Sequence, residues 1–184
     1  MRAPEGRASS PADLATQAAY LLERLRVRQP RVHCITNAVA QNFTPNVLHA
    51  IGALPSMTIA RSEVAAFAAR ADALLVNLGT FDPERRAAAE AAIPQMDAAA
   101  KPWVLDPVLI DRSPARSDYA QTLLASRPAA IRMNAAEFSE LSGAVSPQDF
   151  PQAQRTVVAI TGETDLVTDG SRTLRIANGH ALMA

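Results

Sequence analysis

Short apolar runs that stop abruptly at a polar residue recur along this 184-residue chain. The clearest run, Trp103–Leu105, ends at Asp106. A second run, Ala129–Ile131, is followed by Arg132 and then by a helix pattern that opens at Asn134. Such runs are typical of buried parallel strands, and ligands bind outside the carboxyl ends of those strands. A carboxylate and a guanidinium gathered at that edge would suit a metal-bound polyphosphate.

Strand and helix patterns alternate for most of the chain. This alternation predicts an α/β fold with a mainly parallel central sheet and helices on both faces. Capping residues mark expected helix starts at Ser10, Asp82, Ser113 and Asn134. Near the end, the apolar segments 166–168 and 173–176 flank Asp169 and Gly170, which predicts a hairpin. We expect residues 1–9 to form a disordered tail and residues 10–184 to form one domain.

Three local features refine the predicted positions of helices and strands. Pro94 lies inside an alanine-rich helical stretch and should kink or split it. Pro147 and Pro151 disfavour a helix between residues 146 and 155. A brief strand is expected over residues 56–59, which would place Met57 inside it.

Composition excludes several classes of function. The 18 basic and 18 acidic residues cancel, so no electrostatic footprint for nucleic acid or an anionic membrane is present. The single cysteine, Cys34, excludes an internal disulfide and a cysteine-based zinc site, and it is expected to be a small buried residue. No segment has the pattern of a membrane-spanning helix or of a secretory signal peptide. We therefore expect a cytoplasmic protein.

A set of short motifs occurs in a fixed order from His33 to the end of the chain. The motifs are His33–Asn37, Asn42–Thr44, Asn77–Thr80, Leu105–Val108, Ala130–Arg132, Asn134–Glu137, Ala159–Glu163 and Asn178–His180. In order and spacing they resemble the hydroxyethylthiazole kinase family, which acts in thiamine salvage and has a ribokinase-like fold.

The resemblance implies an activity and a site. The expected reaction is phosphorylation of the hydroxyl of 4-methyl-5-(2-hydroxyethyl)thiazole, with ATP as co-substrate and Mg²⁺ as cofactor. The expected assembly is a homotrimer with the thiazole bound where subunits meet. By this resemblance the thiazole contacts are Met57 and Asn37, the ATP-phosphate contacts are Arg132 and Thr161, and the acidic residues near the metal are Asp106 and Glu137.

Several of these residues also have a purely structural interpretation. Glu137 follows Asn134 by three residues, which is the spacing of a capping box, and a capping role and a metal role can coexist. Asp106 precedes a proline and could be a turn residue. Met57 could belong to the core. Arg132 could be a solvated charge, and Thr161 could belong to a plain turn.

The family pattern continues beyond the last motif into a glycine-rich anion hole with a catalytic cysteine. The chain ends at Ala184 before that pattern, so we expect a fold incomplete at its C-terminal side and no catalytic residue within the chain. A positioned general base contributes about 10²–10⁴ in rate, so at most trace activity is expected. The alternative hypothesis is a non-catalytic thiazole-binding or assembly subunit. A third hypothesis is a different reaction of a ribokinase-like enzyme. The motifs at His33–Asn37 and Asn77–Thr80 argue against it.

Overall fold

Residues 11–177 and residue 179 are described by a computed structural model, and they form one sheet flanked by helices. The strands lie in the order β2-β1-β3-β4-β5-β6-β7-β8. Strands β1 to β6 pair with one another in parallel, β7 pairs antiparallel with β6, and β7 and β8 form the expected antiparallel hairpin. Their bounds are β1 Arg31–Ile35, β2 Leu54–Ser56, β3 Ala73–Asn77, β4 Trp103–Asp106, β5 Ala130–Asn134, β6 Val157–Thr161, β7 Asp165–Thr168 and β8 Thr173–Ile176.

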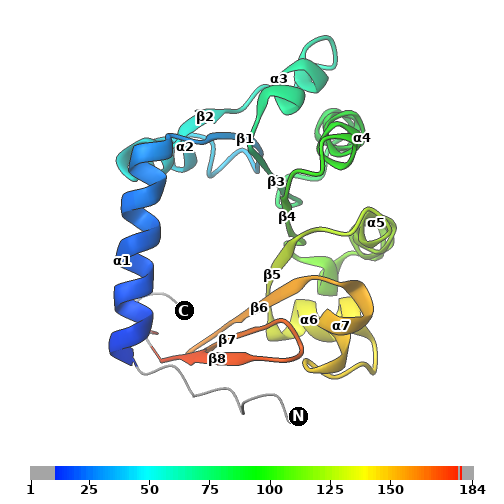
Figure 1. The fold of residues 1–184 in the computed structure, drawn as a ribbon. Helices are drawn as coiled ribbons and strands as arrows, with labels where there is room; N and C mark the ends of the chain where they lie inside the picture. Colours follow the sequence, from blue (N-terminus) through cyan, green and yellow to red (C-terminus); the bar gives the residue numbers. More distant parts are fainter. Residues whose placement is uncertain (1–10, 178, 180–184) are drawn as a thin grey trace.

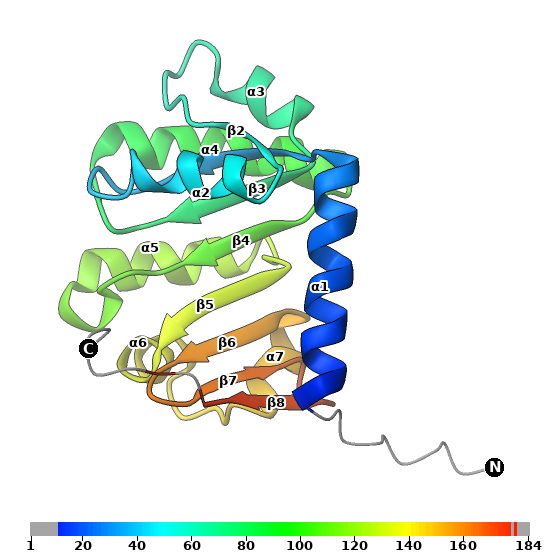
Figure 2. The same cartoon turned by 90° about the vertical axis from the view of Figure 1, so that its left-hand side faces the viewer.

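Helices lie on both faces of this sheet, as predicted. Figure 1 shows α3 to α7 on one face, with α1 and α2 on the other. Figure 2 shows α1 crossing the sheet on the side away from the arrowheads of the parallel strands, so α1 does not cover their carboxyl ends. The helices are α1 Pro11–Arg28, α2 Phe43–Ala50, α3 Val64–Arg70, α4 Pro83–Ala98, α5 Pro114–Leu124, α6 Ala135–Ser142 and α7 Asp149–Gln154, with a 3₁₀ turn η1 at Ile110–Arg112. None of the helices within the described ranges is long and apolar enough to cross a membrane.

The core lies between the sheet and the helices α3 to α7. Alternate strand residues point to opposite faces, so Leu74 and Val76 of β3 are buried beneath α4, whereas Leu75 between them is only half-buried. The opposite face is covered sparsely, because the side chains of α1 are mostly exposed: Tyr20 is 57% and Leu21 is 61% accessible. The helix-covered face therefore carries most of the apolar burial that stabilises the fold.

Pro94 does not split its helix, and Pro151 does not prevent one from forming. The helix α4 continues through Pro94, because Ile93 and Met96 on either side of it are buried in the core and outweigh one lost backbone hydrogen bond. The helix α7 forms despite Pro151, which lies in its first turn, where backbone N–H groups have no partner within the helix. Its Phe150 packs edge-on against Phe138, 5.7 Å between ring centroids.

The expected strand over residues 56–59 was also misplaced. β2 comprises Leu54–Ser56, since Leu54 pairs with Arg31 and Ser56 with His33 of β1. Met57 therefore follows the strand. The proposed tail at residues 1–9, the cap at Ser10 and the motif residues Asn178 and His180 lie outside the described residues.

Strand β1 buries a histidine and a cysteine side by side. His33 is fully buried, and its Nδ1 lies 2.8 Å from the hydroxyl of Ser56. Burial lowers the pKa of His33, against an opposing contact with the backbone of Thr58. Burial also raises the pKa of the Cys34 thiol to about 11, so the buried, unreactive cysteine predicted from sequence is confirmed.

The buried imidazole should make stability depend on pH. In the unfolded chain a histidine binds a proton below its ordinary pKa of 6.5, but the folded chain resists that proton. Stability is therefore complete above pH 6.5 and falls as the pH drops toward the lowered pKa of the folded state, by at most about 1.4 kcal/mol per pH unit. Urea unfolding between pH 7.5 and 5.5 should show a shallower fall for His33→Gln than for wild type. His49→Gln, on an exposed face of α2, is the matched control, and equal slopes for both variants would refute the assignment.

Candidate functional site

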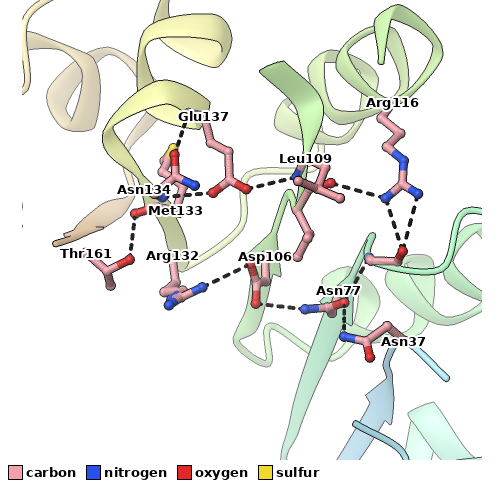
Figure 3. Close-up of polar contacts among 12 residues, drawn as sticks. Asn37, Asn77, Asp106, Leu109, Arg116, Arg132, Met133, Asn134, Glu137 and Thr161 are labelled. Carbon is pink, nitrogen blue, oxygen red and sulfur yellow. Dashed lines mark hydrogen bonds and ion pairs between the residues drawn. The ribbon is translucent and has the colours of Figure 1, made fainter. Parts of the chain in front are cut away.

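The carboxyl-terminal edge of the sheet carries five residues predicted from sequence, together with Asn77. Each lies at or just beyond the carboxyl end of a parallel strand, apart from Arg132, which lies within β5. In sheet order they are Met57 after β2, Asn37 after β1, Asn77 ending β3, Asp106 ending β4, Arg132 in β5 and Thr161 ending β6. Figure 3 shows the polar contacts along this edge.

Asp106 lies at the centre of the edge with one oxygen engaged and one available. Its Oδ2 accepts a hydrogen bond from Asn77 Nδ2 at 2.8 Å (Figure 3). Its Oδ1 is buried, has no hydrogen-bond partner among the described residues and lies 3.8 Å from the guanidinium of Arg132. Burial raises the pKa of Asp106, Arg132 and Asn77 oppose the rise, and the charge of Glu137 adds to it. An under-coordinated carboxylate oxygen beside an arginine suits a cation that is itself bound to phosphate.

Glu137 is buried and fully occupied by backbone groups. The predicted capping box is confirmed: Glu137 Oε2 accepts from the Asn134 N–H at 2.8 Å, and Asn134 Oδ1 accepts from the Glu137 N–H at 2.9 Å. The other oxygen, Oε1, accepts from the N–H of Leu109 at 2.8 Å, where the backbone is left-handed with φ 60°. Glu137 therefore ties the start of α6 to the loop that follows Asp106.

Replacing Glu137 with glutamine should destabilise the fold. A glutamine offers one acceptor oxygen, so its NH₂ group would face either the Asn134 or the Leu109 N–H and leave that donor unpaired. An unpaired buried donor costs about 1–3 kcal/mol, or roughly 2–12 °C in Tm for a chain of this length. Thermal unfolding should show this loss for Glu137→Gln and little change for Glu140→Gln, which lies exposed on the same helix and keeps an oxygen that can accept from the Ser117 hydroxyl. A Glu137→Gln variant as stable as wild type would exclude this bridging role.

Arg132 and Thr161 flank the far side of Asp106 with spare donor capacity. The Arg132 side chain is 54% exposed, and its contact with Asp106 is long. The hydroxyl of Thr161 donates to the Met133 carbonyl at 3.4 Å, near the limit of a hydrogen bond. Neither side chain is locked by its present partners, so both can turn toward an anion placed at this edge.

Asn37 and Met57 differ in how they join this arrangement. Asn37 is connected to the network: its Nδ2 donates to Asn77 Oδ1 at 3.0 Å, and its Oδ1 accepts from the Ala40 N–H at 2.8 Å. Met57 is half-buried beside the edge strand β2, and no polar contact of the described residues joins it to Asn37 or Asp106. The structure therefore places five of the six predicted residues along the stretch of edge shown in Figure 3 and leaves Met57 at one end of the row.

Two structural residues of the site were not assigned from sequence. Asn77 ends the apolar strand β3 just as Asp106 ends β4, so the same signal could have found it. Arg116 of α5 had no such signal. Its guanidinium donates to the carbonyls of Leu78, Gly79 and Val108, which holds the loops after β3 and β4 together.

The donor set fits a magnesium ion carried by a nucleotide better than a resident metal. No group of three or more His, Cys, Asp or Glu side chains that could hold a metal occurs within residues 11–177 or at 179. Mg²⁺ commonly takes one or two carboxylates and completes its shell with water and phosphate oxygens. The available Oδ1 of Asp106 meets that requirement.

Comparisons with known proteins agree with this geometry. Residues 22–148 match the model of the hydroxyethylthiazole kinase family. A hydroxyethylthiazole kinase from Cronobacter sakazakii is 45% identical over 185 residues, covering 91% of this chain and 70% of that protein. One from Klebsiella pneumoniae is 47% identical over 182 residues, covering 90% of this chain and 71% of its own length.

The fold agrees as well. The solved structure of a hydroxyethylthiazole kinase from Pyrococcus horikoshii superposes with a TM-score of 0.86 at 34% identity, over 91% of this chain and 69% of that one. A ribokinase-like superfamily protein from Enterococcus faecalis, with a TM-score of 0.56 at 10% identity, shares the fold alone. The expected ribokinase-like α/β class is confirmed.

Proposed function

Because this chain belongs to the hydroxyethylthiazole kinase family, we propose that it phosphorylates the hydroxyl of 4-methyl-5-(2-hydroxyethyl)thiazole with ATP. The observation that carries the proposal is 45% identity to a protein named for this activity, sustained over 91% of the chain. The relatives carry the name of a kinase, which favours the enzyme over a non-catalytic subunit.

Arg132 and Thr161 bind the phosphates of ATP. Phosphoryl transfer depends mainly on positioning and on neutralising the charge of the transferred group. The guanidinium of Arg132 offers a planar fork for two phosphate oxygens, which an ammonium group cannot copy. The Thr161 hydroxyl adds a donor from the neighbouring strand, since β5 and β6 are paired in register at this end.

Asp106 and Glu137 serve the metal in different ways. A magnesium ion bound with ATP would supply positive charge that offsets the charge of the transferred phosphate. Asp106 contributes Oδ1, which points toward Arg132 and has no other partner among the described residues. Both oxygens of Glu137 accept from backbone N–H groups, so this residue holds the loop after Asp106 in place and does not bind the metal directly. Its negative charge still adds to that of Asp106 near the metal.

Asn37 and Met57 bind the thiazole on the other side of Asp106. A flexible thioether packs well against an aromatic heterocycle. A cytoplasmic homotrimer with thiazole bound between subunits completes the proposal. The position of Met57 beside the sheet edge supports it, because Leu54 on β2 and the nearby Phe67 are each 43% exposed and could be covered by another subunit.

Product formation tests the function directly. The purified chain is incubated with hydroxyethylthiazole, ATP and Mg²⁺, and mass spectrometry measures the phosphate ester above a no-protein control. Ester that accumulates with protein concentration is the expected result. Binding of thiazole without binding of ATP, measured by calorimetry, would instead favour the non-catalytic subunit.

A further inference from the structure

The side chain of Asn77 lies between the thiazole side and the phosphate side of the site. It is 8% exposed and belongs to β3, an interior strand of the sheet. Its Oδ1 accepts from Asn37 Nδ2 at 3.0 Å and from the Gly79 N–H at 2.9 Å. Its Nδ2 donates to Asp106 Oδ2 at 2.8 Å. One amide group therefore contacts residues proposed for both substrates.

The three contacts allow only one orientation of this amide. Rotating the group by half a turn would set its NH₂ against two donors, Asn37 Nδ2 and the Gly79 N–H. It would also set its oxygen against the carboxylate of Asp106. Each contact therefore strengthens the others, and the loss of the Asn37 donor would loosen the hold on Asp106.

The backbone around Asn77 is fitted closely to the same amide pair. A Cβ atom at Gly79 would lie 2.8 Å from Asn37 Cβ and 2.9 Å from Asn77 Oδ1, so only glycine leaves room there. The carbonyls of Leu78 and Gly79 are held by Arg116, and the Leu78 N–H donates to the Asp106 carbonyl at 3.0 Å. The loop is thus fixed on both sides of the amide.

We propose that Asn77 is a positioning residue that couples the two substrate subsites. It orients Asp106 for magnesium–ATP and Asn37 for the thiazole alcohol, so Asn37 acts on nucleotide binding through Asn77 without reaching Asp106. The inference rests on the proposed function, because it takes Asp106 and Asn37 as the residues that meet the two substrates.

The test measures the affinity for magnesium–ATP in the absence of thiazole, by titration calorimetry. Removing a residue that hydrogen-bonds a metal-binding carboxylate typically lowers metal affinity by about 10- to 100-fold. We expect a loss in that range for Asn77→Ala. Asn37→Ala should weaken binding in the same direction but less. The double variant should lose no more affinity for magnesium–ATP than Asn77→Ala alone, because Asn37 acts only through Asn77. Gly79→Ala, which removes no polar group but crowds the amide pair, should also weaken binding.

A matched variant separates positioning from general loss of stability. Thr168→Val removes a buried hydroxyl at the end of β7, far along the sheet from Asp106, that donates to the Arg172 carbonyl in the turn before β8. It should lower the unfolding temperature without changing magnesium–ATP affinity. Wild-type affinity in Asn37→Ala, or losses that simply add in the double variant, would overturn the coupling while leaving the kinase function standing. A wild-type chain that binds no magnesium–ATP would overturn the proposed function and the inference with it.

Discussion

Replacing Asp106 with asparagine should lower kcat for thiazole phosphorylation by about 10²–10³-fold, the loss typical of one preorganised charge-stabilising group. The change is isosteric, and the asparagine carbonyl can still accept from Asn77. What it removes is the negative charge on the available oxygen, which we propose meets the cation on ATP. Steady-state assays at saturating ATP and Mg²⁺ measure the effect. Asp118→Asn, on the exposed surface of α5, is the matched control, and a wild-type kcat for Asp106→Asn would exclude the metal role.

The same substitution should act on stability with the opposite sign. Burial raises the pKa of Asp106 above its ordinary value of 3.8, so folding is penalised once the carboxyl group is ionised. The penalty is absent below pH 3.8, grows as the pH rises from 3.8 to the raised pKa, and is constant above it. Asp106→Asn should therefore have a higher free energy of unfolding than wild type at pH 7, and the advantage should shrink as the pH is lowered. Urea unfolding at several pH values measures it; an advantage independent of pH would point to a cause other than ionisation.

Site residues could be predicted from sequence where a single local pattern determined their position. The apolar run Trp103–Leu105 predicted both a buried strand and a polar side chain at its carboxyl end. Parallel pairing then placed Asp106 beside Asn77 and near Arg132 without further information. The capping box at Asn134 was equally local, because its partners are three residues apart.

The features of the site and fold that could not be predicted from sequence depend on contacts between segments far apart in the chain. The second bond of Glu137 reaches Leu109, 28 residues earlier, and the carbonyls held by Arg116 come from two other loops. The misplaced β2 is a similar case, since its register is set by pairing with β1. Pro151 was misjudged because its place in the first turn of α7, and not its mere presence, decides its effect.

Replacing Arg132 with alanine should raise the KM for ATP by roughly 10- to 150-fold, the equivalent of losing hydrogen bonds worth about 1.5–3 kcal/mol to a charged group. The KM for thiazole should change little, because Asn37 and Met57 lie on the other side of Asp106. Stability should hardly change either: the pair with Asp106 is 3.8 Å long with Arg132 54% exposed, and such pairs contribute about 0–1 kcal/mol. Arg112→Ala, which removes a 77% exposed arginine beyond β4, is the matched control. An unchanged dependence on ATP would exclude the phosphate role.

Replacing Arg132 with lysine separates charge from shape. Lysine keeps the positive charge near Asp106 but presents a single ammonium group instead of a planar fork. If geometry matters, Arg132→Lys should resemble Arg132→Ala in its KM for ATP; if charge alone matters, it should resemble wild type. The structure favours the first outcome, because the guanidinium is not locked by its long contact with Asp106 and can present both of its outer nitrogens to a phosphate.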